Sequence, residues 1–307
     1  SSPGADLIPS WVFRQCSFEL ASPVTVLLNT TFAEGRVPQE WHSAIITPVP
    51  KIQKPASISD FRPISVTSLL SRLAERMLIQ NYLQPCVSAE LMEDQFAFRA
   101  TGSTTAALTC LLHKVTKSLE INTYVRCLMI DFSRAFDIVD RELLLLKLQL
   151  LDAPDSIMKW IASFLSNRSQ HTFINGSASD ELPVNLGVVQ GSVLGPSLFS
   201  IFVADLQPIS KYNDMVKFAD DVTILAPEST DSDIAVELNH VKEWALANRM
   251  VINLSKTKEL VFQRPRPSQV ILPPCLIGIE RITIVKLLGV HIDIHFSFSE
   301  HISFILR

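Results

Sequence analysis

Three aspartates stand where the sequence pattern predicts the ends of β-strands. Asp131 closes the apolar run "CLMID", and Asp220 and Asp221 are adjacent in "KFADDVTIL", between two short apolar runs. Carboxylates gathered at the ends of neighbouring strands repel one another. Divalent cations relieve that repulsion, and an all-oxygen ligand set favours Mg²⁺. The pattern therefore predicts metal-assisted phosphoryl transfer, in which two ions activate an attacking hydroxyl and stabilise the leaving group.

A purely structural role for the Asp pair is the alternative interpretation. A two-residue hairpin loop needs backbone angles that Asp tolerates better than most residues, so Asp220 and Asp221 could serve only as a turn. The presence of Asp131 at the end of another strand favours the metal site.

The rest of the chain predicts an α+β fold. One helix is expected to carry Leu69, Leu73 and Met77 on one face, and a polar loop is expected to run up to Phe61. The expected helices are 18–32, 68–83, 103–119, 141–150, 157–165, 195–206 and 231–248. The expected strands are 43–51, 124–131, 168–176, 215–219, 222–226, 258–262, 280–284 and 285–292, with a proline-rich link at 264–275.

Composition places the chain among globular proteins. Its 307 residues are 47% hydrophobic with a mean hydropathy of +0.25, enough to enclose a full core. The most apolar run, "LLLLKLQLL", is interrupted by Lys147, and the first residues lack the features of a signal peptide. We therefore expect no membrane span. The five cysteines show no metal-ligand spacing and are interpreted as buried thiols in a reducing compartment.

Charge is distributed unevenly along the chain. The formal net charge of −4 argues by itself against a polyanionic partner. Acidic residues predominate between 127 and 240, whereas basic residues are in excess in 36–126 and 241–307. An acidic centre between two basic flanks suits a metal site bordered by surfaces that hold phosphates, although chance clustering on a solvated surface explains the same pattern.

The motifs around the three aspartates resemble those of reverse transcriptases of the non-LTR (LINE-like) retrotransposon group. "CLMIDFSRAFDIVD" resembles the family's first palm motif, "GVVQGSVLGPSLF" its second and "KFADDVTIL" its third. Upstream, "WHSAIITPVPK", "ISDFRPISVTSLLSRLAERML" and "DQFAFRATGSTTAAL" resemble finger motifs. Downstream, "WALANRMVINLSKTKELVF" and "KLLGVHID" resemble the fourth palm motif and the primer grip. These matches occur in the family's order along nearly the whole chain.

The resemblance implies a right-hand polymerase with fingers, a palm made of an antiparallel sheet with packed helices, and a thumb that is largely absent. Residues 1–40 would form an N-terminal helical extension and 41–126 the fingers. Residues 127–262 would form the palm, with part of the fingers interleaved near 140–185. Residues 263–307 would form the primer grip and the start of the thumb.

The resemblance also assigns catalytic roles. Asp131, Asp220 and Asp221 would bind two Mg²⁺ ions, with Mn²⁺ as a possible substitute, and the backbone carbonyl of Phe132 would join them. Lys256 in "NLSKTK" would protonate the leaving pyrophosphate. A solvated lysine is an equal alternative at that position.

Contacts to the incoming dNTP are implied in the same way. Phe136 matches the aromatic residue that packs beneath the sugar and leaves no room for a 2′-hydroxyl, with a core aromatic as the alternative. Arg62 and Lys51 match the finger cations that grip the triphosphate. Gln190 and Gly191 match the segment whose backbone approaches the nucleotide, which a residue without Cβ permits.

Template and primer contacts complete the set. Arg99 would contact the template, and Leu288, Gly289 and Val290 would position the primer end. Because a polymerase must accept any sequence, recognition would depend on phosphates and on the shape of an A-like hybrid.

Several residues depart from the family's pattern, but none of them removes a metal ligand. Val189 stands where proline is usual, Ala97 where glycine is usual, "FADD" where tyrosine commonly leads, and "RATGST" as a shifted loop. We therefore expect a nucleotidyltransferase, an RNA-directed DNA polymerase. The alternatives are an impaired remnant that at most binds RNA, an RNA-dependent RNA polymerase, and a group II intron maturase. Phe136 argues against the use of rNTPs, and a maturase would need a following thumb and an intron-binding domain.

The implied partners are an RNA template, a DNA primer or target DNA, and dNTPs, with no membrane. An endonuclease would lie elsewhere in the full-length element. The expected location is intracellular, in the cytoplasm and nucleus, as a ribonucleoprotein.

Overall fold

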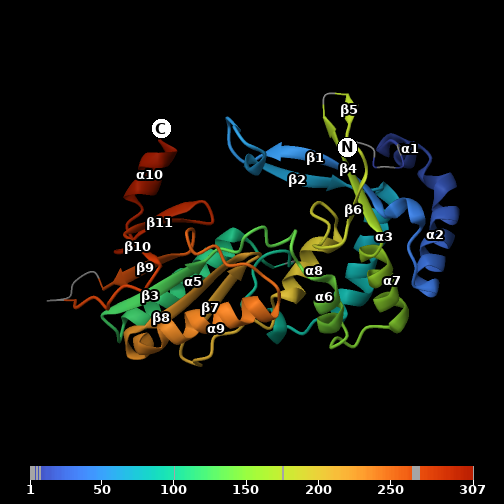
Figure 1. The fold of residues 1–307 in the computed structure, drawn as a ribbon. Helices are drawn as coiled ribbons and strands as arrows, with labels where there is room; N and C mark the ends of the chain where they lie inside the picture. Colours follow the sequence, from blue (N-terminus) through green and yellow to red (C-terminus); the bar gives the residue numbers. More distant parts are fainter. Residues whose placement is uncertain are drawn as a thin grey trace. The chain divides into compact units, whose positions relative to one another are not determined.

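The computed structural model describes Gly4, Asp6 and residues 8–99, 101–174, 176–264 and 270–306, with only the backbone of 232 and 233 (Figure 1). It divides into two compact units, each made of two chain segments. The first unit is Ser1–Ser88 with Phe136–Phe202, and the second is Ala89–Ala135 with Val203–Arg307. The two units are defined by compactness, whereas the predicted fingers, palm and thumb are functional divisions. The bounds predicted for those divisions therefore stay a prediction. Among the described helices, none combines the length and the apolar character that crossing a bilayer requires.

The second unit is built on a five-stranded sheet in the order β10-β9-β3-β8-β7. The central strand β3 is antiparallel to both of its neighbours, so that Cys127 lies between Leu225 of β8 and Leu260 of β9. β7 continues the sheet antiparallel to β8, and β10 runs parallel to β9. The strands are β3 Tyr124–Ile130, β7 Asp214–Phe218, β8 Asp221–Pro227, β9 Lys258–Gln263 and β10 Glu280–Ile282.

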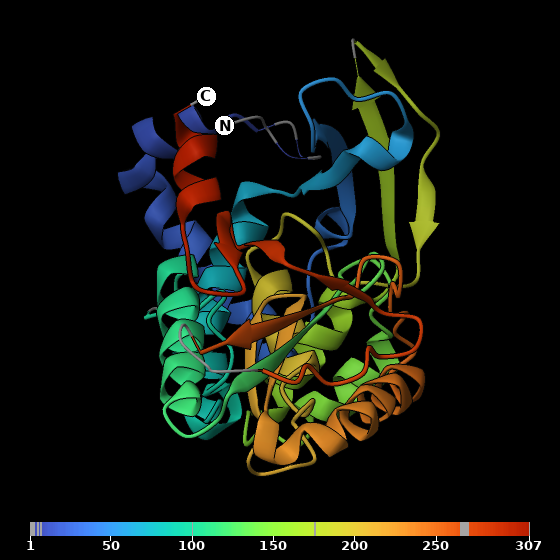
Figure 2. The same cartoon turned by 90° about the vertical axis from the view of Figure 1, so that its left-hand side faces the viewer.

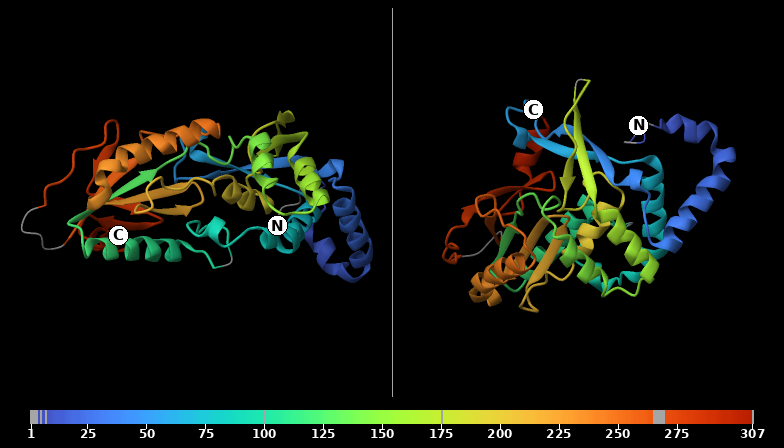
Figure 3. Two further views of the ribbon diagram at one scale, coloured as in Figure 1. Left: turned by 90° about the horizontal axis from the view of Figure 1, so that it is seen from below. Right: turned by 45° about the vertical axis from the view of Figure 1, so that its right-hand side comes forward.

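Helices α5, Thr104–Leu119, and α9, Ile234–Ala247, run along opposite sides of this sheet (Figures 2 and 3). The α5 helix begins where the Ser103 hydroxyl accepts a hydrogen bond from the backbone N–H of Ala106, which satisfies one of the free donors of a helix start. Its buried residues recur at helical spacing and share a core with alternate residues of β3 and with Ile292. Ile292 belongs to the β11–β12 hairpin, and the remaining elements are β11 Ile284–Leu287, β12 Val290–Asp293 and α10 Ser299–Ile305.

A buried ion network crosses the sheet of the second unit. Arg126 on β3 is 3% exposed, and its Nε donates to Glu259 on β9 at 2.6 Å. Glu259 is fully buried, and its second oxygen accepts from Nε of Arg281 on β10 at 2.7 Å. Arg126 also pairs with Asp231 at 2.8 Å. Both arginines donate to the carbonyls of 273–274, which fastens part of the predicted proline-rich link to the sheet; residues 265–269 of that link lie outside the described residues.

The first unit contains a second sheet with β1 at its centre. β1 pairs antiparallel with β2 and parallel with β4, while β6 and the short β5 pair with β4. The sequence did not predict β2, because Pro63 interrupts it. In the structure β2 is an edge strand in which Pro63 lies opposite Pro48, a position that needs no N–H donor. The strands are β1 Ser43–Pro50, β2 Phe61–Val66, β4 Arg168–Ile174, β5 Ser177–Ala178 and β6 Leu182–Val184.

Helices surround an aromatic core in the first unit. Trp160 of α7 stacks on Phe164 at 5.5 Å and contacts Phe32 of α2 at 5.7 Å between ring centroids. The predicted apolar face of α3 is wrong, since Leu73 is 40% exposed while Glu75 is fully buried. The helices are α1 Ser10–Gln15, α2 Ser17–Glu34, α3 Leu69–Leu78, α4 Gln84–Cys86, α6 Arg141–Leu148, α7 Asp155–Leu165 and α8 Leu194–Phe202.

The five cysteines are free thiols, but they are not all buried as predicted. Cys127 on the central strand is buried, whereas Cys16 and Cys275 are exposed. Cys16 lies in the turn between α1 and α2, and Cys275 lies in an irregular stretch before β10. Connecting segments run over the protein surface, where a small apolar side chain is not shielded from water.

Candidate active site

The three predicted aspartates lie at one end of the second unit's sheet. Asp131 follows the last residue of β3, and Asp221 is the first residue of β8. Because Ile130 pairs with Val222, the next positions along the ladder bring Asp131 and Asp221 opposite each other. Asp220 immediately precedes Asp221, in the turn between β7 and β8. The backbone register thus gathers three carboxylates from distant sequence positions at a single edge.

The turn that carries Asp220 differs from the predicted loop. Phe218 pairs with Asp221, so the two loop residues are Ala219 and Asp220, and Asp221 belongs to the strand. Ala219 takes a left-handed conformation with φ of 57°, which is unfavourable for a residue with a Cβ. Such strain persists only where neighbouring contacts hold it, and it is common at functional sites.

Burial and neighbouring charges raise the pKa values of two aspartates at this edge. Asp221 is exposed to solvent, yet protein atoms around its carboxylate, followed by the charges of Asp220 and Asp131, raise its pKa to about 6. Burial also raises the pKa of Asp131, and the positive charge of Lys256 opposes that rise. Burial and like charge therefore both favour the protonated form of Asp221.

The pH dependence of stability follows from the raised pKa of Asp221. The folded chain holds this proton up to about pH 6, whereas an unfolded Asp releases it near pH 4. The contribution of Asp221 to stability is thus greatest below pH 4 and is lost as the pH rises through the interval to 6. We expect Asp221→Asn to gain stability relative to the parent over this interval, measured by urea unfolding at pH 4 and pH 7. Equal differences between the two proteins at both pH values would contradict the assignment.

The carboxylates do not form a closed metal cage. Across the described residues, no group of three or more His, Cys, Asp or Glu side chains is arranged to hold a metal ion. Mg²⁺, however, is typically held by one or two carboxylates together with substrate phosphates and water. An open edge of oxygen donors is compatible with that mode of binding.

The segment that follows α9 supports the end of β3 that carries Asp131. The isolated bridge between Phe132 and Ile252 continues the pairing beyond Asp131, and the backbone N–H of Asn253 donates to the carbonyl of Asp131 at 2.8 Å. The Phe132 ring is buried and meets Trp244 of α9 edge-on, with centroids 6.1 Å apart. The turn after Asn253 carries the exposed Lys256, so this predicted residue accompanies the aspartates.

Gln95 fastens the strained turn, a role that sequence reasoning missed. Its Oε1 accepts hydrogen bonds from the backbone N–H groups of Ala219 and Ala97, both at 3.0 Å. Next to it, Lys217 of β7 is fully buried, and its Nζ lies 2.9 Å from Asp94. Backbone bonds join Lys217 to Asp94 at 2.7 Å and to Phe96 at 2.9 Å. The segment 94–97 therefore acts as an extra partner for the strand that leads to Asp220.

Gln95→Met is expected to loosen this support, because it leaves two buried N–H groups without an acceptor. Each unpaired group costs about 1–3 kcal/mol, so the free energy of unfolding should fall by several kcal/mol. The turn that presents Asp220 should also lose order, and we expect a higher Mg²⁺ concentration for half-maximal activity. Gln149→Met, at an exposed helix end, is the matched control. An unchanged metal requirement in Gln95→Met would show that Gln95 is structural only.

Gln190 and Gly191 lie in the first unit and are attached to β2. The carbonyl of Gln190 accepts from the backbone N–H of Ser65 at 2.7 Å. Gly191 has φ of 108°, and a Cβ there would come within 2.5 Å of the Ser65 carbonyl oxygen. Both the backbone angle and the close approach require glycine at this position.

Gly191→Ala should destabilise the chain by more than about 2 kcal/mol, since strain and clash add. Gly278 is a suitable control, because its φ of 78° is also positive but a Cβ would meet nothing within 4 Å. Gly278→Ala should therefore cost only the strain of about 1–2 kcal/mol. Chemical denaturation of both variants measures the difference in the free energy of unfolding. Equal losses in the two variants would show that the close approach to Ser65 adds nothing to the cost.

A buried glutamate holds the helix that follows this loop, which sequence reasoning also missed. Oε2 of Glu75 accepts from the backbone N–H groups of Val193 and Leu194 at 2.8 and 2.9 Å. Its Oε1 accepts from the Ser71 hydroxyl at 3.0 Å. Burial raises the pKa of Glu75, while these bonds favour the charged form. Acceptance of the first N–H groups of α8 by Glu75 stabilises the start of that helix. No sequence signal indicated this role, because Glu75 lies on the side of α3 opposite the predicted apolar face.

The other predicted nucleotide contacts also belong to the first unit. Phe136 stacks on Phe199 of α8 with centroids 4.3 Å apart, so its ring has a firm backing. Arg62 is exposed on β2 opposite Val49. Lys51 is exposed as well, and its Nζ donates to the carbonyl of Ser59 at 2.8 Å. Their contacts are described within that unit alone.

The predicted template and primer residues lie in the second unit. Arg99 turns inward, with Nη1 donating to the carbonyls of Met92 and Gln95 at 2.6 and 3.1 Å. The stretch 288–290 forms the end of the β11–β12 hairpin, where Leu288 and Gly289 have φ of 47° and 91°. These angles suit a tight two-residue turn. Ala100 of the predicted shifted loop lies outside the described residues.

Sequence comparison identifies the relatives of this chain. A family model described as "Reverse transcriptase (RNA-dependent DNA polymerase)" matches residues 50–292. The RNA-directed DNA polymerase from mobile element jockey of Drosophila melanogaster is 28% identical over 98% of the chain. The probable RNA-directed DNA polymerase from transposon X-element of the same species is 29% identical over 98%. The chain covers 34% of each, about a third of their length. The resemblance predicted from the motifs is thereby confirmed.

Comparison with solved structures concerns the fold. Apo telomerase from Candida tropicalis, truncated from its C-terminal domain, matches with a TM-score of 0.54 and 14% identity, over 92% of this chain and 59% of that one. Telomerase from Candida albicans in complex with a TWJ fragment of telomeric RNA matches with a TM-score of 0.52 and 11% identity, over 90% and 48%. The predicted α+β fold of polymerase fingers and palm is confirmed.

Proposed function

Because the chain belongs to the reverse transcriptase (RNA-dependent DNA polymerase) family, we propose that it is the polymerase part of a non-LTR retrotransposon protein. It would extend a primer 3′-hydroxyl with dNTPs on an RNA template. Membership of the family implies a divalent metal and binding of an RNA template. The observation that carries the proposal is the meeting of Asp131, Asp220 and Asp221 at one strand edge, where their repulsion contributes to the raised pKa of Asp221.

Two Mg²⁺ ions are the proposed metals. The carboxylates of Asp131, Asp220 and Asp221 and the carbonyl of Phe132 are oxygen donors of the kind that Mg²⁺ and Mn²⁺ prefer. The raised pKa of Asp221, to which the charges of Asp220 and Asp131 contribute after burial, supports the fit, because a bound cation would favour the ionised carboxylates. When bound, the ions stabilise the charge that develops on the transferring phosphoryl group and lower the pKa of the attacking hydroxyl. The positive charge of Lys256 lowers the pKa of Asp131. Lys256 would donate a proton to the leaving pyrophosphate.

The nucleotide contacts are proposed for residues of the first unit. Arg62 and Lys51 would hold the triphosphate, since both are exposed cations. The Phe136 ring, backed by Phe199, would exclude a 2′-hydroxyl and so favour dNTPs. Gln190 and Gly191 would contact the nucleotide through their backbone, which Gly191 leaves open because it has no Cβ.

The remaining assignments rest on the resemblance. Arg99 would contact the template, and Leu288, Gly289 and Val290 the primer end. We also propose an endonuclease elsewhere in the full-length element, a DNA target as primer, and an intracellular ribonucleoprotein in the cytoplasm and nucleus. Val189 and Ala97, which depart from the family's pattern, are both buried within the fold.

Primer extension tests the proposal. The chain, within the full-length element, is incubated with poly(rA)/oligo(dT), Mg²⁺ and either dTTP or UTP. Incorporation of dTTP that requires the metal, with little incorporation of UTP, is the expected result. RNA binding without incorporation would instead establish the remnant, and equal use of UTP would contradict the role of Phe136.

A further inference from the structure

A short segment of the first unit, residues 184–188, is paired with the segment that begins at Phe136. The backbone N–H of Val188 donates to the carbonyl of Phe136 at 2.9 Å. The backbone N–H of Gly187 donates to the carbonyl of Val139 at 2.8 Å. Because two bonds join the segments, the backbone position of Phe136 depends on that of residues 184–188.

Close packing at Gly187 strengthens this link. A Cβ at Gly187 would come within 2.6 Å of the carbonyl oxygen of Asp137, so the two backbones touch there. Val139 is fully buried and Val188 is 4% exposed. In so dense a region, a shift of one segment would displace the other.

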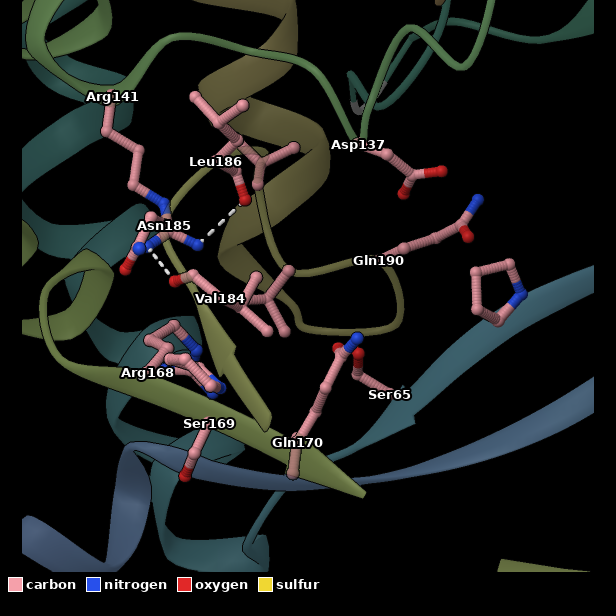
Figure 4. Close-up of a pocket in the computed structure, with 15 residues that line it drawn as sticks. Ser65, Asp137, Arg141, Arg168, Ser169, Gln170, Val184, Asn185, Leu186 and Gln190 are labelled. Atoms are coloured by element: carbon pink, nitrogen blue, oxygen red, sulfur yellow. Dashed lines mark hydrogen bonds between the residues drawn. The ribbon is translucent and has the colours of Figure 1, made fainter. Parts of the chain in front are cut away.

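Arg141, the first residue of α6, holds the same segment through its guanidinium group. Its Nη1 donates to the carbonyls of Leu165 and Val184, both at 2.6 Å. Its Nη2 donates to the carbonyl of Leu186 and its Nε to that of Gly187, both at 2.9 Å. Figure 4 shows the bonds to Val184 and Leu186, beside a pocket of about 450 Å³ that Arg141 helps to line. A guanidinium presents its donors in a rigid planar fork, so these bonds fix the orientation of the segment as well as its position.

The start of α6 gives Arg141 a fixed base. The side chain of Asp140 accepts from the backbone N–H of Leu143 at 3.0 Å and so caps the helix. Asp140 is 5% exposed. Burial lowers the pKa of Arg141 to about 10, so its bonds to the carbonyls are charge-assisted at neutral pH.

Helix α8 holds the ring of Phe136. The ring stacks on that of Phe199 with an interplanar angle of 19° and centroids 4.3 Å apart, and Phe199 is fully buried. The Phe136 side chain itself is only half-buried, so part of the ring remains accessible. The backbone bond from Val188 and the stack on Phe199 therefore determine where that accessible part lies.

We propose that Arg141 is a positioning residue for sugar selection, which acts through residues 184–188 on the ring of Phe136. The inference rests on the proposed function, because it presupposes that Phe136 excludes the 2′-hydroxyl of an rNTP. A ring excludes a single hydroxyl only where the ring cannot yield by the size of that group. The bonds of Arg141 would supply this stiffness, since they hold the segment to which the backbone of Phe136 is attached.

Primer extension by the full-length element on poly(rA)/oligo(dT) tests the proposal, as the ratio of kcat/KM for dTTP to kcat/KM for UTP. Arg141→Lys keeps the charge, but an ammonium group cannot reproduce a planar fork. An apolar surface rejects one additional hydroxyl by about a hundredfold. We expect Arg141→Lys to lose roughly tenfold of this ratio, through a gain in UTP use that a general loss of activity would not produce.

A double-mutant cycle tests whether Arg141 acts through the ring. Phe136→Ala should abolish the selection of dTTP. Adding Arg141→Lys to it should leave the ratio of Phe136→Ala unchanged, because both substitutions act on the same ring and their effects are not additive. A further change of similar size in the double variant would overturn the proposal.

Arg168→Lys is the matched control. Arg168 belongs to the same unit and is 3% exposed, and its Nη1 donates to the carbonyl of Phe164 in α7 at 2.9 Å. We expect Arg168→Lys to lose stability but to keep the parent's ratio of dTTP to UTP use. An equal fall in both variants would mean that any loosening of the unit weakens sugar selection, and it would overturn the role of Arg141.

Since Arg141→Lys could fail to fold, Gly187→Ala provides a variant that keeps Arg141 and forces the two backbones apart at Asp137. Its ratio should fall as well, and an unchanged ratio would overturn the proposal. Hydrogen exchange in the parent needs no variant. The amides of Gly187 and Val188 should exchange slowly, and rapid exchange would show that the link to Phe136 is not maintained.

The parent separates this inference from the proposed function. A parent that extends no primer contradicts the proposed function, and this inference with it. A parent that selects dTTP, together with an Arg141→Lys variant that selects it equally, contradicts this inference alone.

Discussion

Asp220→Asn is expected to lower primer extension by about a thousandfold or more, since metal ions contribute several kcal/mol to phosphoryl transfer and each 1.4 kcal/mol is a factor of ten. Asparagine keeps the size of the side chain but removes the charge that would bind the metal. Asp220 lies in the two-residue turn between β7 and β8, and its charge is one of those that raise the pKa of Asp221. Removing that charge should lower the pKa of Asp221 while the chain keeps its fold.

Single-turnover extension and Mn²⁺ binding by electron paramagnetic resonance would measure the two effects separately. Asp214→Asn is the matched control, because Asp214 lies at the other end of β7 and pairs with Lys114 in a partly exposed ion pair. Such pairs contribute about 1 kcal/mol or less, so this variant should stay close to the parent in activity. If Asp220→Asn extended primers and bound Mn²⁺ like the parent, the metal site would have to be sought elsewhere.

Glu259→Ala is expected to lower the free energy of unfolding by about 3–5 kcal/mol, the usual loss when one partner of a buried ion pair is removed. Glu259 is fully buried and separates the guanidinium groups of Arg126 and Arg281. Without it, Asp231 is the one charged partner that Arg126, at 3% exposure, keeps among the residues the structure describes. This loss is large beside the 5–15 kcal/mol of a typical domain, and the strands that hold Asp131 would open more often.

Urea unfolding, followed by circular dichroism, measures this effect. Glu280→Gln is the matched control, since Glu280 pairs with Lys258 on the same two strands but at an exposed position. An exposed pair contributes about 0–1 kcal/mol. Equal losses in the two variants would mean that burial does not decide the strength of these ion pairs.

Local pattern predicted most of the elements, and the reasons for the failures are physical. Helices α5, α7 and α9 carry long amphipathic patterns, which single-sequence reasoning detects well. The strand β2 was missed because Pro63 interrupts it, and only pairing with β1 at a sheet edge makes proline acceptable there. The buried face of α3 was misassigned because Glu75 is charged, and its burial depends on donors from Val193 and Leu194 far along the chain.

In the candidate site too, some residues were predicted from local motifs and others were recognised only from tertiary contacts. Asp131, Asp220 and Asp221 were found because the family motifs around them are specific when they occur together and in order, although paired aspartates alone are common. Gln95 was overlooked in "DQFAFR", because nothing in its neighbours shows that its amide accepts from Ala219. Arg141 and Arg168 gave no signal either, since an arginine at a helix start or strand start is ordinary surface chemistry until burial is known.

The sequence by itself therefore determined the family, the fold class and the acidic residues of the site, because these depend on residue types and on short-range periodicity. The tertiary structure alone decided how the site is supported. Pairing of β3 with β8 brings Asp131 opposite Asp221, whose pKa is raised first by burial and then by the charges of Asp220 and Asp131. Contacts across long sequence separations bury Gln95, Glu75 and Arg168. Hydrogen bonds and charges of this kind act over a few ångströms in space, and distance along the chain does not reveal them.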